Sequence, residues 1–191
     1  MRIITIPGSL RAGSFNRKLI QIANDLLIRS DIELETLDLK DYPLPLYDGD
    51  LEDSEGIPDN ARRLQAKIAA GQGVIISSPE YNSSIPGTFK NMLDWTSRGG
   101  ANPWGGKIIG LMGVTTGLWG ALRGMPHLRI VMNALGGFVI PQQINIAHAE
   151  KVWDDSGKLL DDKLSSRIEK FVRVFLETTE KLHGDRRSGM Q

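Results

Sequence analysis

Near its start the sequence runs Ile3-Ile-Thr-Ile-Pro-Gly-Ser-Leu-Arg-Ala-Gly-Ser-Phe-Asn16, and this stretch decides the fold. Residues 3–6 are apolar and rich in β-branched side chains, a pattern typical of a buried strand. Pro7 and Gly8 end this strand, and a helical repeat of apolar residues begins at Phe15. The order of strand, polar turn and helix predicts the first unit of an α/β domain.

The turn between this strand and this helix is rich in groups that bind anions, since Ser9, Arg11, Ser14 and Asn16 all lie in it. A helix N-terminus offers unpaired N–H groups and partial positive charge, to which Ser, Asn and Arg add donors. Two common phosphate loops are excluded, because neither Gly-x-x-x-x-Gly-Lys-Ser/Thr nor Gly-x-Gly-x-x-Gly is present. The turn is therefore either a phosphate cradle or an ordinary turn in which Ser14 caps the helix and Arg11 is solvated.

Composition narrows the class of protein. The chain has 191 residues, 23 basic and 23 acidic side chains, and no cysteine. The charge balance argues against a nucleic-acid partner and against the acidic surface of an electron carrier. The lack of cysteine excludes disulfides, thiol catalysis and cysteine-ligated metals, so any redox chemistry needs a bound cofactor. No apolar run approaches membrane-spanning length and no signal-peptide pattern is present, which predicts a cytoplasmic protein with no membrane partner.

The remaining elements follow from hydrophobic periodicity, and we expect one domain over residues 1–183 with a flexible tail at 184–191. Strands are expected at 3–6, 32–37, 73–78, 107–114 and from 138. Helices are expected at 15–28, 58–71, 86–97, one that starts or kinks at Pro126 and continues to 135, and 161–182. The last helix should bury Leu164, Ile168, Phe171, Phe175 and Leu182. A long surface loop is expected at 41–50 and a turn-rich excursion at 152–159.

Five strands alternating with helices predict an α/β fold, a three-layer doubly wound parallel sheet with strand order 2-1-3-4-5. In such a sheet the ligand lies beside the carboxyl ends of strands 1 and 3. Three loops should meet there, at residues 8–16, 79–87 and 113–120. The first offers phosphate donors, the second offers Tyr81 and polar groups, and the third is glycine-rich enough for a flat ring to approach. This combination fits FMN in a flavodoxin-like fold.

Two of these loops resemble the signatures of the NAD(P)H-dependent FMN reductase family, which includes quinone, chromate and azo-dye reductases. They read Gly8-Ser-Leu-Arg-Ala-Gly-Ser-Phe-Asn16 and Pro79-Glu-Tyr-Asn-Ser-Ser-Ile-Pro-Gly87, and further similarity appears at 44–51, 89–95 and 127–129. The resemblance spans essentially the whole chain. It implies bound FMN, NADPH or NADH as electron donor, a small acceptor such as a quinone, free FMN, an azo dye or chromate, and a homodimer or homotetramer.

The resemblance also implies which residues bind FMN. Those matching the family's phosphate and ribityl contacts are Ser9, Arg11, Ser14, Phe15 and Asn16. Those matching its ring contacts are Pro79, Glu80, Tyr81, Asn82, Ser83, Gly113, Thr115, Thr116 and Gly117. No protein side chain need be catalytic, because hydride passes to N5 of the flavin, and Glu80 is better explained as a loop anchor. The family commonly has Ser-Pro-Gly where this chain has Thr115-Thr116-Gly117, and a polar stretch where this chain has Gly124-Met-Pro126.

Several other residues invite a functional interpretation. Tyr47 and Asp48 in the long surface loop are candidates for the wall of the substrate pocket. The three histidines lack the spacing of a metal site, so none is expected. Trp104 and Trp119 could stack on a substrate, although packing is the expected role of both. Together with Met125 they lie in irregular segments, which favours burial against a second subunit. A flavodoxin-like electron carrier and a non-catalytic FMN-binding regulator remain as alternatives to the enzyme.

Overall fold

A single five-stranded parallel sheet forms the centre of the molecule in the computed structural model, which describes residues 1–100, 102–154 and 157–184. The strand order is β2-β1-β3-β4-β5, and every neighbouring pair is parallel, as predicted. Sequence periodicity located each strand to within a few residues. The strands are β1 (Arg2–Pro7), β2 (Glu33–Thr36), β3 (Gly73–Ser77), β4 (Ile108–Val114) and β5 (Phe138–Ile146).

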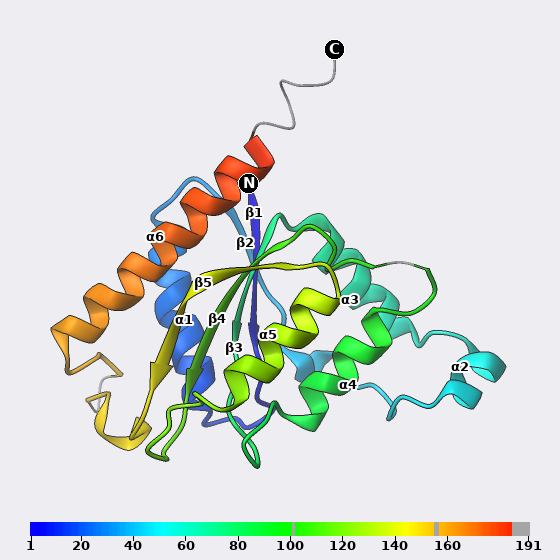
Figure 1. The fold of residues 1–191 in the computed structure, drawn as a ribbon, viewed down its shortest axis with the longest axis horizontal. Coiled ribbons are helices and arrows are strands. Elements are labelled where there is room, and N and C mark those ends of the chain that lie inside the picture. Colours follow the sequence, from blue (N-terminus) through cyan, green and yellow to red (C-terminus); the bar gives the residue numbers. More distant parts are fainter. Residues whose placement is uncertain (101, 155–156, 185–191) are drawn as a thin grey trace.

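Helices cover both faces of the sheet, which gives the three layers seen in Figure 1. One face carries α1 (Phe15–Ile28) and α6 (Asp162–Gly184), and the other carries α3 (Asp59–Ala70), α4 (Gly87–Thr96) and α5 (Gly124–Ala134). Each face has its own apolar core. Because β3 and β4 are covered on both faces, every residue in them is buried, which explains their nearly continuous apolar sequences.

The predicted helix stripes are confirmed except at the end of α6. Leu164, Ile168, Phe171 and Phe175 are buried, but Leu182 is 46% exposed. The last turns of α6 extend past the edge of the sheet where the strands begin, so there is little there to cover them (Figure 1). Residues 185–191, which make up nearly all of the predicted tail, lie outside the described residues.

The surface loop expected at 41–50 is present at 42–48, and short helical elements that the sequence did not reveal lie at its two ends. A 3-10 turn, η1 (Leu39–Asp41), is followed by α2 (Gly49–Glu55), which lies apart from the sheet (Figure 1). No residue of α2 is buried, and it therefore lacks the apolar stripe by which helices are recognised. Its start is instead fixed by Asp48, whose carboxylate accepts a hydrogen bond from the backbone N–H of Asp50 at 3.0 Å.

The structure also shows whether the fourth predicted helix starts or kinks at Pro126. Helix α5 begins two residues earlier, so Pro126 lies in its first turn, where a missing N–H costs nothing. Trp104 and Met125 are fully buried within this one chain, so the expectation that they need a second subunit for burial is wrong. Both join the core beneath α3, α4 and α5.

Candidate functional site

Three loops meet at the carboxyl edge of the sheet, as the sequence predicts. The backbone N–H of Gly8 donates to the carbonyl of Ser77 at 2.8 Å, which joins the first loop to the second. The N–H of Ser78 donates to the carbonyl of Met112 at 2.9 Å, which holds the end of β3 against β4. Residues distant in sequence are thereby fixed side by side at the place where ligands bind in doubly wound folds.

Asn16 ties all three strand ends together. Its Nδ2 donates to the carbonyl of Val114 at 2.9 Å, and its Oδ1 accepts from the N–H of Val114 at 3.1 Å. The same Oδ1 accepts from the Ser77 hydroxyl at 2.9 Å. Because the amide is buried and used in this way, we assign Asn16 to bracing the site, while its predicted contact with the FMN phosphate stays a prediction.

The first loop has donors that the protein leaves available. Ser14 occupies the N-cap position of α1, but its hydroxyl makes no capping hydrogen bond, and the first turn holds no acidic residue. Arg11 is exposed and forms no ion pair with a described carboxylate. The Ser9 hydroxyl accepts from the N–H of Arg11 at 3.3 Å, which leaves its own proton free for another acceptor. These groups suit an anion at a positive helix terminus.

An aromatic pair borders this loop. Phe15 stacks on Trp153 with ring centroids 5.4 Å apart and planes 14° from parallel. The Lys18 ammonium lies 5.6 Å from the Phe15 centroid and 5.9 Å from that of Trp153. Trp153 belongs to the excursion after β5. The sequence around Trp153 does not predict its contact with Phe15, which lies far away in the chain.

The second loop folds into a tight turn that presents Tyr81. Tyr81 and Ser84 exchange two backbone hydrogen bonds, at 2.9 and 3.0 Å. The residues between them, Asn82 and Ser83, have φ values of 50° and 63°, as in a type I′ turn. Tyr81 remains 46% exposed at the tip. The turn therefore displays an aromatic ring and backbone groups at the edge of the sheet.

Glu80 anchors that turn to the start of α5. Its carboxylate accepts from the backbone N–H groups of Arg123 at 2.8 Å and Gly124 at 3.0 Å, and pairs with the Arg123 guanidinium at 2.7 Å. The Glu80 side chain is only 6% exposed. Burial favours its protonated form, but the donors from Gly124 and Arg123 outweigh that and lower the pKa of the carboxyl. The interpretation of Glu80 as a loop anchor agrees with these contacts, and Arg123 is a partner that sequence pattern alone does not single out.

The third loop begins at a glycine that cannot be replaced without displacement. A Cβ on Gly113 would lie 2.6 Å from the Ala121 and Met125 side chains and 2.8 Å from the Ser78 carbonyl oxygen. Beyond it, the N–H of Thr115 donates to the Ile146 carbonyl at 3.0 Å. Thr116 and Gly117 are exposed, and a Cβ on Gly117 would make only an ordinary contact, with the Thr115 hydroxyl at 3.9 Å. The loop is thus tight at its base and accessible at its tip.

Two residues predicted for the substrate pocket are engaged elsewhere. The Tyr47 hydroxyl donates to Glu52 at 3.0 Å, and its ring lies edge-on to Trp95 and under the Arg98 guanidinium. Asp48 caps α2. The hydrogen bond to Glu52 raises the pKa of the Tyr47 phenol. These contacts hold the segment against α4, and among the described residues neither side chain forms a hydrogen bond or ring contact with the three loops.

Two further candidate residues lie at these loops, Trp119 within the third and His127 beside the second. Trp119 is 52% exposed in the single chain, with the Arg123 guanidinium 5.7 Å from its ring, so it is not part of this chain's core, and its burial against a second subunit stays a prediction. His127 Nδ1 lies 2.8 Å from the Ser84 hydroxyl. In the described part of the chain no three His, Asp or Glu side chains are grouped closely enough to bind a metal. Over the same residues, no helix combines the length and apolar character required to cross a bilayer.

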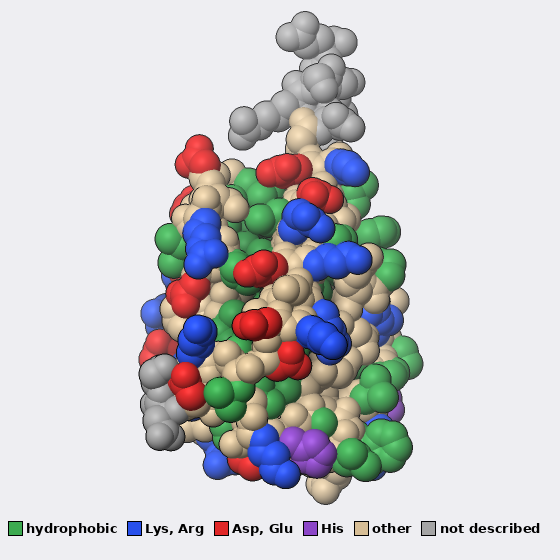
Figure 2. Space-filling model, turned by 90° about the vertical axis from the view of Figure 1, so that its left-hand side faces the viewer, with side chains coloured by type: hydrophobic (Ala, Val, Ile, Leu, Met, Phe, Trp, Pro, Cys, Tyr) green, Lys and Arg blue, Asp and Glu red, His purple; other side chains and the backbone are tan. Residues whose placement is uncertain are grey.

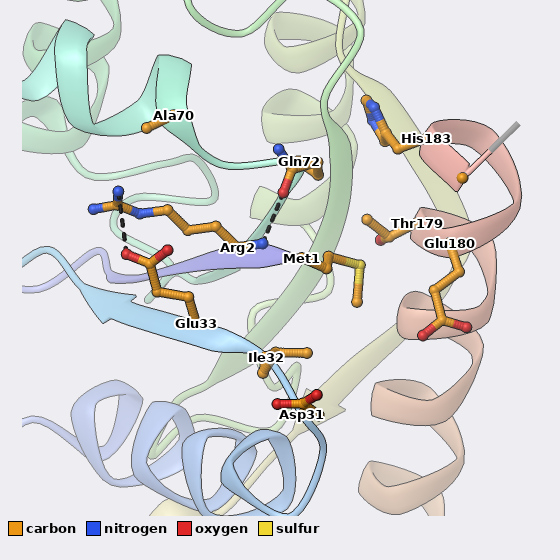
Figure 3. Close-up of a pocket in the computed structure, with 11 residues that line it drawn as sticks. Met1, Arg2, Asp31, Ile32, Glu33, Ala70, Gln72, Thr179, Glu180 and His183 are labelled. Atoms are coloured by element: carbon orange, nitrogen blue, oxygen red, sulfur yellow. Dashed lines mark hydrogen bonds and ion pairs between the residues drawn. The ribbon is translucent and has the colours of Figure 1, made fainter. Parts of the chain in front are cut away.

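A hollow of about 1020 Å³ lies at the opposite, amino edge of the sheet (Figure 3). Arg2 lies on its wall, where it pairs with Glu33 at 3.3 Å, and its backbone N–H donates to Gln72 at 2.7 Å. In parallel α/β sheets the ligand crevice lies outside the carboxyl ends, because the loops and helix N-termini are there. Size alone therefore does not identify this hollow as the site.

Comparison with known proteins agrees with the geometry. The family model described as NADPH-dependent FMN reductase matches residues 1–151. An NAD(P)H-dependent FMN reductase of Pseudomonas aeruginosa is 31% identical over 185 residues, covering 96% of this chain and 98% of the relative. A 2-hydroxy-1,4-benzoquinone reductase of Burkholderia sp is 34% identical over 189 residues, covering 98% of each chain.

A solved structure is similar over nearly the same extent. FerB, a flavoenzyme NAD(P)H:(acceptor) oxidoreductase from Paracoccus denitrificans, superimposes with a TM-score of 0.79 at 30% sequence identity. The match covers 94% of this chain and 97% of that one. The family match over residues 1–151 includes all five strands and the three loops at their carboxyl ends.

Proposed function

Because this chain belongs to the NADPH-dependent FMN reductase family, as its two motifs predicted, we propose that it is an FMN-dependent oxidoreductase. It uses NAD(P)H to reduce quinones or similar small acceptors, the activity after which its relatives are named. The observation that carries the proposal is the convergence of three loops at one sheet edge, with donors left unused in the first. Such an edge suits a ligand with a phosphate at one end and a planar ring at the other.

The residues present fit FMN. Ser9, Arg11 and Ser14 would hold the phosphate, with the positive end of α1 behind them. The ring would lie between the other two loops. It would be bordered by Pro79, Glu80, Tyr81, Asn82 and Ser83 on one side and by Gly113, Thr115, Thr116 and Gly117 on the other. Bound there, FMN would supply the two-electron chemistry, accepting hydride from NAD(P)H and passing electrons to the acceptor.

The protein's own contribution would be to hold the ring by its edges and to leave one face open. Nicotinamide would have to stack on that face to bring its hydride within about 3–3.5 Å of the flavin atom that accepts it. The quinone would use the same face, so the two substrates would bind in turn. This order predicts parallel double-reciprocal lines when NAD(P)H is varied at several fixed quinone concentrations. Intersecting lines, with a ternary complex in equilibrium binding, would mean two separate substrate sites.

Two alternatives make different predictions. An electron carrier would transfer electrons to a protein partner through an acidic surface, whereas this chain has no net charge. The face over α6 carries basic and acidic side chains interspersed (Figure 2). A regulatory FMN-binding protein would bind FMN without turnover. The test is an absorption spectrum of the purified protein with FMN, before and after NADPH, followed by NADPH oxidation with a quinone. A protein that binds FMN and neither bleaches nor turns over is not this enzyme.

We also propose that the protein is a homodimer or homotetramer. Leu118, Trp119 and Leu122 are 68%, 52% and 47% exposed in the third loop and just after it, where burial against another subunit would stabilise them. A mass near that of a single chain in light scattering at micromolar concentration would exclude association.

We also propose that the protein is located in the cytoplasm, because the proposed reaction consumes NAD(P)H.

A further inference from the structure

Strand β5 is irregular at its middle. Ile109 of β4 pairs with Val139, but Leu111 pairs with Gln143, so β5 has two extra residues between these pairs. Pro141, which has no N–H to donate, lies in that interval. The Arg129 guanidinium donates through Nη1 to the carbonyls of Ile140 at 2.9 Å and Val139 at 3.3 Å. Arg129 of α5 therefore satisfies carbonyls at the point where the ladder is interrupted.

From Arg129 a chain of hydrogen bonds runs along β5 to the third loop. Arg129 Nη2 donates to Gln143 Oε1 at 3.2 Å, and Gln143 Nε2 donates to Asn145 Oδ1 at 2.7 Å. Asn145 Nδ2 then donates to the backbone carbonyl of Gly120 at 3.0 Å. The chain thus begins in the interior of α5 and ends in the loop that borders the expected cofactor.

The direction of this chain is fixed by its two ends. A guanidinium can only donate, so Gln143 must turn its carbonyl oxygen toward Arg129 and its NH₂ group toward Asn145. A backbone carbonyl can only accept, so Asn145 must turn its NH₂ group toward Gly120. All three bonds point the same way from a full positive charge, an arrangement in which each bond polarises the next.

The loop end that receives the chain is conformationally demanding. Gly120 has φ +55°, and a Cβ there would lie 2.6 Å from the Ile146 carbonyl carbon and 2.7 Å from the Ala147 nitrogen. Ala121 follows with φ +66°, a conformation that a non-glycine residue adopts only under constraint. The backbone bond from Thr115 to Ile146 holds the other end of the loop. Asn145 therefore supplies a side-chain tie where the backbone is strained.

We propose that Arg129, Gln143 and Asn145 form a positioning relay that fixes residues 115–121 at the edge of the flavin ring. The inference rests on the proposed function for its effect on FMN, but the relay itself is a property of the protein alone. None of the three side chains needs to touch the cofactor. Their role is to hold the loop in the one conformation that borders the ring.

Gln143→Glu tests the direction of the relay. The carboxylate keeps acceptors for Arg129 and gains an ion pair, so thermal stability should hold or rise. It has no N–H for Asn145, however. If Asn145 turns its NH₂ toward the carboxylate, its oxygen faces the Gly120 carbonyl oxygen; if it does not turn, two acceptors face each other. One link is lost in either case. We expect roughly 3–10-fold weaker FMN binding, the range for one hydrogen bond, and a changed spectrum of bound FMN.

Gln142→Ala is the matched control, because this exposed neighbour makes no side-chain hydrogen bond to a described residue. Asn145→Ala should weaken FMN binding as Gln143→Glu does, and the two changes together should cost less than their sum. Backbone amide exchange in residues 115–121 of the cofactor-free protein should quicken in both variants and not in Gln142→Ala.

The outcomes separate the two proposals. Failure of the wild-type protein to bind FMN would refute the proposed function, while amide exchange would still decide whether the relay holds the loop. Wild-type FMN affinity, spectrum and amide exchange in both Gln143→Glu and Asn145→Ala would overturn the relay. Equal losses of thermal stability and FMN binding in all variants, the control included, would also overturn it.

Discussion

The two edges of the sheet use their polar groups in opposite ways. At the amino edge, Arg2 pairs with Glu33 and Glu35, and Lys107 donates to the carbonyls of Ala69 and Gly71 at the end of α3. At the carboxyl edge, Arg11 has no carboxylate partner among the described residues and the hydroxyl at the N-cap of α1 does not cap. The amino edge has the hollow, yet its cationic side chains Arg2 and Lys107 already have partners within the protein. Available donors, rather than depth, distinguish the candidate site.

The largest effect should come from breaking the brace at the carboxyl edge. Asn16→Ala removes three hydrogen bonds and leaves both backbone groups of Val114 and the Ser77 hydroxyl buried without partners. Unsatisfied buried groups are costly, so the free energy of unfolding should fall by about 3–5 kcal/mol. Chemical denaturation measures it.

Gln72→Ala provides the matched amide at the amino edge, since it loses a single acceptor for the N–H of Arg2. We expect about 0.5–1.5 kcal/mol there, with FMN binding unchanged. Equal losses in the two variants would mean that Asn16 does not brace the site.

The next effect concerns charge at the phosphate position. Arg11→Ala should weaken FMN binding by about 1.5–3 kcal/mol, the range for a hydrogen bond to a charged group, and leave the fold intact. Arg11→Lys should restore only part of the loss, because Lys lacks the planar fork. Calorimetric titration with FMN measures both, and riboflavin should be insensitive to either change because it has no phosphate.

Arg2→Ala is the control for that experiment, because Arg2 lies at the amino edge and pairs there with Glu33 and Glu35. It should lower stability and leave FMN affinity alone. An Arg11→Ala protein with wild-type affinity would show that Arg11 is simply solvated, the alternative that the sequence left open.

Sequence reasoning succeeded where a physical period or a topological rule applies. The apolar repeat of α1 gave its bounds, and parallel strands with helical connections brought three distant loops to one edge. It did not reveal contacts whose partner is distant in the sequence. The bracing role of Asn16 is one, because its amide bonds to Val114, 98 residues away, while its predicted contact with FMN stays a prediction. Helix α2 buries no residue, so it has no apolar stripe by which it could be predicted. The exposure of Trp119 depends on the conformation of its loop, which hydrophobic periodicity does not predict.

A smaller, pH-dependent effect is expected from one carboxyl at each edge, Glu80 at the carboxyl edge and Glu35 at the amino edge. The donors around Glu80, and those around Glu35 from Lys67 and Arg2, lower the pKa of each carboxyl against the opposing effect of burial. A lowered native pKa stabilises the fold above the ordinary value of 4.5, and that contribution is lost as the pH falls through the lower native value. Glu80→Gln should cost about 1–2 kcal/mol at neutral pH, and the difference from wild type should shrink below pH 4.5.

Glu35→Gln should show the same pH dependence of the free energy of unfolding, measured by denaturation over a pH series. Only Glu80→Gln should also weaken FMN binding, because only Glu80 holds a loop of the candidate site. A Glu80→Gln protein whose stability deficit is constant from pH 7 to pH 3 would contradict the lowered pKa.

The smallest effect is expected at Tyr47, which lies at neither edge. Its hydroxyl bonds to Glu52 and its ring packs between Trp95 and Arg98, so it holds the 42–48 segment to α4. Tyr47→Phe removes only the hydroxyl and keeps both ring contacts. We therefore expect kcat and the KM for quinone to match wild type in steady-state assays. Tyr81→Phe is the contrasting variant, because Tyr81 is exposed at the tip of the second loop. A rise in KM for Tyr47→Phe without a change in kcat would mean that this phenol forms the wall of the acceptor pocket, as the sequence predicts.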